Sequence, residues 1–435
     1  MRSISALSSR SPRLVLALRV GMVGALVAFG PIACGGGGDT PVSPLTPTPP
    51  VVPAVRPSPA AVTAYLDSAV SFTETYFYFG ERIDWRAVRQ RAAQRAAGAQ
   101  TFRETYPAID TLARELQDPH SFFYLPSQTL GNREDPSGPL YTPISLVIAP
   151  KIGYLWLPSF GGRNAVGRAD TLQRLIAEAD SVADGACGWI IDQRANVGGF
   201  WPVMLAGISP LVTPGIVGGF AERNPRGRYL YYVGAGVAGL QEGTNGPRYE
   251  FLAATRRYEL RRKNPPVALL QGQFTASAGE IVVMAFKDTT RGIRTFGGPT
   301  TGVTTQPYTF RMRDTASLQI TAAIMFDRLG RNYGGGAIPP DQPESGTGVA
   351  GSFGSAFRPG TRGENVVESA ITWLQSRPEC QGTVASDPDL SPAMRGIWRS
   401  TAPTPGALQR GDWPKGKPTP WTAQGTPRSL LQRPF

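Results

Sequence analysis

The chain contains few of the side chains that bind metals or nucleotides. It has one histidine and three cysteines in 435 residues, whereas zinc and iron–sulfur sites need clusters of these ligands. The phosphate-binding pattern Gly-x-x-x-x-Gly-Lys-Ser/Thr is absent, which excludes a P-loop nucleotide enzyme. Lysine is scarce as well, with 5 residues against 39 arginines. We therefore expect no metal and no cofactor, and few side chains are available as a general base.

The charge does not point to nucleic acid, although the formal net charge is +12. About +4 falls in each of residues 1–60, 61–380 and 381–435, so the basic residues are dispersed. Dispersed charge is typical of a solvated surface, and nucleic-acid binding needs a basic patch or stripe. We expect no nucleic-acid partner.

The amino terminus has the pattern of an export signal. Four arginines precede an apolar run, Val20–Phe29, which is too short to span a bilayer, and a small residue, Ala33, follows shortly. Residues 1–33 are therefore predicted to be a signal peptide. Cys34 follows Ala33 directly, which resembles a bacterial lipoprotein signal in which that cysteine is acylated and anchors the protein to the membrane. The alternative is an ordinary cleaved signal with an incidental cysteine.

Segments rich in glycine and proline flank the folded part of the chain. Residues 34–59 read as an extended tether, and residues 383–435, Pro-rich and basic, read as a poorly ordered tail. With Cys34 used for lipidation, Cys187 and Cys380 remain in an oxidising compartment. A disulfide between them is one expectation, and two unrelated buried thiols are the other.

The middle of the chain divides into a helical segment and an α/β region. Residues 60–118 show apolar residues at helical spacing, which predicts two or three packed helices in a small domain. Residues 119–382 alternate short β-rich and helical runs, which favours an α/β fold with a sheet covered on both faces. The predicted strands are Ile144–Ile148, Ile152–Leu157, Gly188–Asp192 and Val267–Leu270, and the predicted helices are Asp170–Ala183, Trp201–Leu211, Ala278–Lys287 and Val366–Gln375.

Three short segments carry groups suited to catalysis. Asp118–Phe122 contains His120, the only histidine, which is alternatively a surface or core residue. Asp192–Gly199 follows a strand, where Gly198 and Gly199 permit close approach of backbone N–H groups to a substrate or simply form a tight turn. Ser277 begins a helix, where free N–H groups stabilise negative charge, yet its spacing to Glu280 is also that of a structural capping box.

A fourth segment carries no obvious chemistry. It comprises Gly297–Gly302, Leu318–Ala322 and Ile338–Asp341, and its sequence predicts loop and strand.

In this order, the segments resemble the tail-specific (C-terminal processing) serine peptidases, peptidase family S41. The motifs are Asp-Pro-His-Ser, Ile-Gly-Tyr-x-x-x-x-Ser-Phe, Ile-Asp-x-Arg-x-Asn-x-Gly-Gly, Thr-Ala-Ser-Ala-x-Glu-Ile and Gly-x-Pro-Thr, and they extend over residues 60–375. The resemblance implies a ClpP/crotonase-like α/β core preceded by helices, with peptides or proteins as substrates. It places the nucleophile at Ser277 and the oxyanion hole at the backbone N–H groups of Gly198 or Gly199 and of Ala278.

The sequence departs from the best-known members of that family in two ways. Only residues 124–151 separate the first two motifs, which is too short for their PDZ domain. Their lysine base is also missing, because Gly302 and Val303 occupy its positions. The PDZ-less members typified by the nisin resistance protein are more similar, and in that group a histidine of the first motif is the base.

The resemblance thus implies an exported, lipid-anchored serine peptidase of the cell envelope with a Ser277–His120 dyad. An imidazole titrates in the range that hydroxyl activation needs. Asp118 and Glu280 are the candidates for an orienting carboxylate. The alternative is a non-catalytic envelope binding protein on the same fold, because the interphotoreceptor retinoid-binding proteins also resemble this family.

Overall fold

The computed structural model describes residues 56–128, 141–182, 184–223, 227–287, 292–344 and 365–381. The predicted signal peptide, Cys34, the tether up to residue 55 and the tail after residue 382 lie outside these residues. Within the described part of the chain, no helix combines the length and apolar composition needed to cross a bilayer.

The first three helices share one core with strands from much later in the chain. They are α1 (Ala60–Tyr76), α2 (Trp85–Arg95) and α3 (Tyr106–Glu115). Their apolar faces pack against Leu318 and Ile320, and the hydroxyls of Tyr65 and Tyr106 both donate to the Asp314 carboxylate. These helices therefore share their core with residues 312–320.

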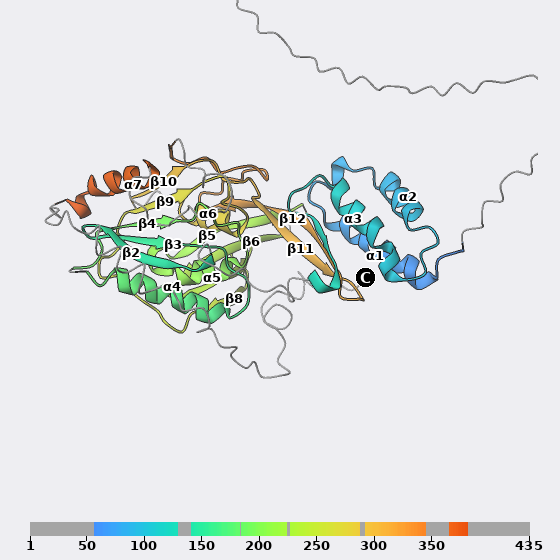
Figure 1. The fold of residues 1–435 in the computed structure, drawn as a ribbon, viewed down its shortest axis with the longest axis horizontal. Helices are drawn as coiled ribbons and strands as arrows, with labels where there is room; N and C mark the ends of the chain where they lie inside the picture. Colours follow the sequence, from blue (N-terminus) through green and yellow to red (C-terminus); the bar gives the residue numbers. More distant parts are fainter. Residues whose placement is uncertain are drawn as a thin grey trace, which may run out of the picture. The chain divides into compact units, whose positions relative to one another are not determined.

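The α/β region contains a six-stranded, mostly parallel sheet in the order β13-β10-β9-β4-β3-β2 (Figure 1). Only the pair β2–β3 is antiparallel. The strands are β2 (Ile144–Ala149), β3 (Ile152–Trp156), β4 (Gly188–Asp192), β9 (Val267–Gln271), β10 (Ile293–Gly297) and β13 (Gln342–Pro343). Strands β3, β4 and β9 are buried along their whole length, as expected of strands covered on both faces.

Helices cover both faces of this sheet. One face packs against α4 (Ala165–Ala179), α5 (Trp201–Gly207) and α6 (Ala278–Ala285), and the other against α7 (Asn365–Gln375) (Figure 1). The predicted helix at Asp170–Ala183 is thus placed too late. It begins five residues earlier, and it ends before Asp180, whose carboxylate accepts the Ala186 N–H.

The second sheet has seven strands and is antiparallel, in the order β1-β12-β5-β6-β7-β8 with β11 also paired to β12. Its strands are β1 (Phe122–Tyr124), β5 (Gly215–Glu222), β6 (Arg228–Gly234), β7 (Val237–Glu242), β8 (Arg248–Ala253), β11 (Thr305–Arg311) and β12 (Ser317–Asp327). Its apolar face packs on the far side of α5 and α6 and shares their core. The predicted α/β class is confirmed, and in the described residues no PDZ domain separates β1 from β2.

Candidate functional site

Ser277 lies in the turn between β9 and α6 with a strained backbone. Its φ of 52° and ψ of −113° are unusual for a residue with a side chain, and such conformations persist only where the surroundings enforce them. Two hydrogen bonds do so here: the Ser277 N–H donates to Glu280 Oε2 at 2.8 Å, and the neighbouring Ala276 N–H donates to the Asn196 carbonyl at 3.0 Å. The predicted capping box with Glu280 is therefore present, and the Ser277 hydroxyl has a further neighbour.

That hydroxyl faces His120. Ser277 Oγ and His120 Nε2 are 3.2 Å apart, although the residues are 157 positions apart in the chain. His120 lies between α3 and β1 and is 9% exposed. Burial lowers the pKa of His120 to about 4, although the Asp118 charge and the Thr305 backbone oppose that shift. The imidazole is therefore neutral near pH 7 and able to accept a proton from the hydroxyl.

The loop after β4 packs directly on the Ser277 turn. A Cβ on Gly198 would lie 2.9 Å from the Ser277 Cβ, and one on Gly199 would lie 2.1 Å from the Phe160 carbonyl oxygen. Both glycines also have positive φ, of 99° and 117°. The sequence Gly-Gly is thus required here, both for the close approach to Ser277 and for the backbone conformation.

The predicted oxyanion-hole donors differ in their present hydrogen bonding. The Gly198 N–H donates to Asn196 Oδ1 at 3.0 Å. Among the described residues, the N–H groups of Gly199 and Ala278 have no hydrogen-bond partner. Ala278 is the first residue of α6, where the N–H groups point out of the helix and its dipole favours negative charge. Gly199 and Ala278 are accordingly the donors already free to bind an oxyanion.

The buried charges of the loop after β4 neutralise one another. The guanidinium of Arg194 binds both carboxylate oxygens of Asp192, and Tyr154 donates to Asp192 Oδ2 at 2.9 Å. Arg194 is 3% exposed and Asp192 fully buried. Removing either charge would leave the other buried and unpaired, so this pair supports the loop that carries Gly198 and Gly199.

Glu280 organises the other side of the Ser277 turn. Its carboxylate accepts hydrogen bonds from Ser277 N, Thr300 Oγ1, Gly302 N and Val303 N. Burial raises the pKa of Glu280, and these four donors oppose the shift. Among these contacts of Glu280 there is none with His120, so of the two candidate carboxylates it supports the Ser277 turn and not the imidazole.

The structure also brings together residues for which the sequence suggested no role. Thr305 is the first residue of β11, and its Oγ1 lies 2.8 Å from His120 Nδ1. Thr321 of β12 contacts both Thr305 and Asp118. The sequence carries no local signal for this role, because Thr321 shares the segment Leu318–Ala322 with another polar residue, Gln319.

The two predicted disulfide partners lie close together. The Cα atoms of Cys187 and Cys380 are 5.0 Å apart, and the structure joins their sulfurs. Cys187 directly precedes β4, and Cys380 follows α7. Cys34 is outside the described residues. Within those residues, no group of three His, Cys, Asp or Glu side chains could hold a metal ion.

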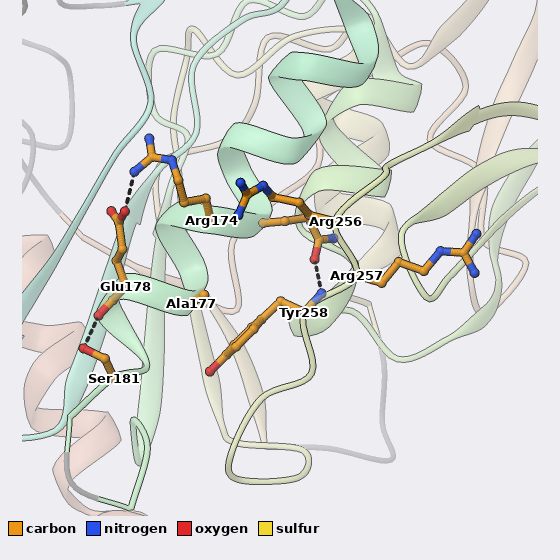
Figure 2. Close-up of a pocket in the computed structure, with 8 residues that line it drawn as sticks. Arg174, Ala177, Glu178, Ser181, Arg256, Arg257 and Tyr258 are labelled. Atoms are coloured by element: carbon orange, nitrogen blue, oxygen red, sulfur yellow. Dashed lines mark hydrogen bonds and ion pairs between the residues drawn. The ribbon is translucent and has the colours of Figure 1, made fainter.

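A surface cleft on α4 is separate from this arrangement (Figure 2). It is lined by Arg174, Glu178, Arg256, Arg257 and Tyr258 among others, and contains neither Ser277 nor His120. Arg174 pairs with Glu178 across one side of it. Its chemistry adds nothing to that of the serine and histidine.

The arrangement as a whole is that of a hydroxyl beside an imidazole and a set of free N–H groups. The family model of peptidase family S41 matches residues 151–343. The predicted resemblance to this family is thereby confirmed.

Two known proteins are similar over most of their length. The nisin-resistance protein of Lactococcus lactis subsp. lactis is 23% identical over 330 residues, covering 74% of this chain and 89% of that protein. The solved structure of a lipoprotein from Streptococcus agalactiae has a TM-score of 0.55 at 20% identity, covering 73% of this chain and 98% of that one. The latter likeness supports the fold.

Proposed function

We propose that this protein is an active serine peptidase in which Ser277 is the nucleophile and His120 the general base. The contact of 3.2 Å between Ser277 Oγ and His120 Nε2 carries the proposal. Ser277 attacks the scissile carbonyl while His120 takes its proton and later returns it to the leaving amine. Substrates are peptides or the C-terminal regions of proteins, as the family resemblance implies.

The oxyanion of the tetrahedral intermediate is held by backbone N–H groups. Ala278 and Gly199 supply donors that are free in the structure, and Gly198 supplies a third if its bond to Asn196 Oδ1 opens. Removing one such donor in a serine peptidase typically costs about 3–4 kcal/mol of transition-state stabilisation. The Ser277 turn and the glycine loop hold these groups before substrate arrives.

The dyad is tested by substitution and by active-site labelling. Ser277→Ala and His120→Ala should each abolish peptide hydrolysis without changing the thermal unfolding midpoint by more than a few degrees. Ser181→Ala, at an exposed position just beyond the end of α4, is the matched control and should keep full activity. A serine-directed phosphonate should label Ser277 stoichiometrically; a folded protein that is neither labelled nor active would support the binding-protein alternative.

We further propose that the protein is exported and anchored to the envelope through Cys34. The signal pattern before Cys34 supports this, and the similar streptococcal protein is itself described as a lipoprotein. One acyl chain gives only marginal membrane binding, so stable anchoring requires two or more on this cysteine. Mass spectrometry of the mature amino terminus should find an acylated Cys34, and an unmodified terminus at another residue would contradict the proposal.

A further inference from the structure

A chain of hydroxyl groups leads from the back of His120 to a carboxylate. Thr305 Oγ1 lies 2.8 Å from His120 Nδ1, and Thr321 Oγ1 lies 3.3 Å from Thr305 Oγ1 and 2.7 Å from Asp118 Oδ2. Thr305 is 3% exposed and Thr321 is fully buried. Water therefore does not compete for these hydroxyls, and they must satisfy each other.

The sheet register explains why residues from three separate segments of the chain meet here. Strand β1 pairs with β12 from Phe122↔Gln319, which brings the residues just before β1 towards Thr321. Strand β11 pairs with β12 on its other side, so that Thr305 begins β11 near the same point. Asp118 is held in place by further donors, the Ser121 hydroxyl and the His120 N–H.

The proton count decides the direction of these hydrogen bonds. Ionised Asp118 only accepts, so the 2.7 Å contact uses the proton of Thr321. The contact between the two threonines then uses the proton of Thr305, and the contact to the imidazole uses a proton on Nδ1. Only this arrangement places one proton in every contact. It leaves Nε2 as the acceptor that faces Ser277.

We propose that Thr305, Thr321 and Asp118 are positioning residues that hold His120 in the Nδ1–H tautomer and orient its Nε2 towards Ser277. This inference deepens the proposed function and rests on it for its catalytic meaning. In the acylation step the Ser277 proton moves to Nε2, and the imidazolium that forms keeps its Nδ1 proton. No proton passes to Asp118; its charge stabilises the imidazolium through the two hydroxyls.

The first test measures directly which imidazole nitrogen of His120 carries the proton, and it does not depend on catalytic activity. Because His120 is the only histidine in the chain, ¹⁵N-histidine labelling of a protein without a histidine tag gives the NMR signals of one imidazole. The protonated nitrogen should be Nδ1 in the wild type. In Thr305→Val, which removes the hydroxyl but keeps the shape, a substantial Nε2–H population should appear. A wild-type imidazole protonated on Nε2 would overturn the proposal.

The second test measures turnover in variants of each member. Thr305→Val, Thr321→Val and Asp118→Asn should lower kcat by at least about tenfold with KM changed by less than about twofold, because orientation of the base affects the transition state and not substrate binding. Thr305→Ser restores the hydroxyl and should recover most of the rate. Thr309→Val, on the same strand but outside the chain of hydroxyls, is the matched control and should keep wild-type kcat.

The outcomes separate this proposal from the proposed function. An active wild type whose Thr305→Val variant keeps both its tautomer and its kcat would overturn the positioning role and leave the peptidase intact. An inactive, unlabelled wild type would overturn the peptidase, and the NMR measurement would still decide the hydroxyl chain. If Thr305→Ser were as slow as Thr305→Val at equal thermal stability, the hydroxyl would not be the determining group and the proposal would fail.

Discussion

Ser277 and His120 are held in place by different means. Ser277 keeps an unfavourable backbone conformation because the Glu280 carboxylate binds its N–H and also binds the loop at Gly302 and Val303. His120 keeps its place through burial and through contacts at both ring nitrogens. The backbone strain at Ser277 and the desolvation of His120 both cost folding free energy, as is usual where groups are arranged for reaction.

Burial of His120 predicts a specific loss of stability in acid. The pKa of His120 falls from 6.5 in the unfolded chain to about 4 in the folded one. Between these values the unfolded state binds a proton that the folded state does not. The stability contributed by the neutral imidazole is therefore complete above about pH 6.5 and is lost as the pH falls towards 4, by a total on the order of 3 kcal/mol.

The comparison with His120→Gln isolates this effect. All other titrating groups are shared, so the free energy of unfolding should fall more steeply in the wild type than in the variant between about pH 6.5 and 4. Urea unfolding at a series of pH values measures both slopes. Parallel curves for the two proteins would show that His120 has an ordinary pKa when folded.

At the scale of elements, α6 has Ser277 at its N-terminal end and a buried lysine just beyond its C-terminal end. Lys287 Nζ donates to Asp341 Oδ1 at 2.9 Å and contacts Thr295 Oγ1 at 3.3 Å. Asp341 in turn accepts from the backbone N–H of Thr295 on β10. These bonds attach the end of α6 to the edge of the parallel sheet, and we therefore predict that Lys287 has a structural role and is not the general base.

Lys287→Ala is accordingly expected to weaken the fold and spare the chemistry. It leaves Asp341 without its cation, but the Asp341 side chain is 47% exposed, so solvent limits the loss to about 1–2 kcal/mol. The kcat of the folded variant should stay within about twofold of the wild type. Denaturant unfolding measures the loss of stability, and turnover normalised by active-site titration measures kcat. Loss of turnover in a fully folded variant would mean that Lys287 acts as a base.

The elements that surround the site were predictable where their patterns are strong. Strands β3, β4 and β9 are nearly continuous apolar runs, and the sequence places them within one residue of their bounds. The antiparallel strands β5–β8 were not predicted. Their sequences are rich in glycine, which is depleted in strands, and pairing between neighbouring strands along the chain determines them.

Residue roles were predictable only where a motif marks them. Ser277, His120 and Gly198 belong to recognisable motifs, and the structure brings them together. Thr305 and Thr321 lie in segments that read as plain loop and strand, and their contact with His120 depends on the register of three strands. No local pattern encodes that register, so the hydroxyl chain could not be inferred before the strands were paired.

On the scale of the whole described region, the site joins the two sheets. The nucleophile follows β9 of the parallel sheet, whereas His120 and its hydroxyl partners belong to the β1–β11–β12 part of the antiparallel sheet. The helices α1–α3 pack on that same part of the antiparallel sheet. Correct placement of the imidazole therefore depends on long-range packing, and stabilising contacts far from Ser277 contribute to the geometry of the dyad.

The link between Cys187 and Cys380 is one such contact. It connects the start of β4 to the segment after α7, over 193 positions in sequence. Closing a loop of that length in the unfolded chain is worth at most about 5 kcal/mol in the chain-entropy model. We predict that the mature protein, unfolded without reductant, shows no free thiol at either cysteine, and that Cys187→Ala with Cys380→Ala lowers the unfolding midpoint by several degrees.

Reduction provides the control for this prediction. Wild-type protein unfolded in reductant should match the double variant, because both lack the covalent link and differ only in two small buried side chains. The midpoint of the double variant itself should be insensitive to reductant. Two free thiols in the unreduced wild type, detected by a thiol reagent under denaturing conditions, would instead mean that α7 is held on the sheet by the packing of Leu374 against Gly188 and its neighbours alone.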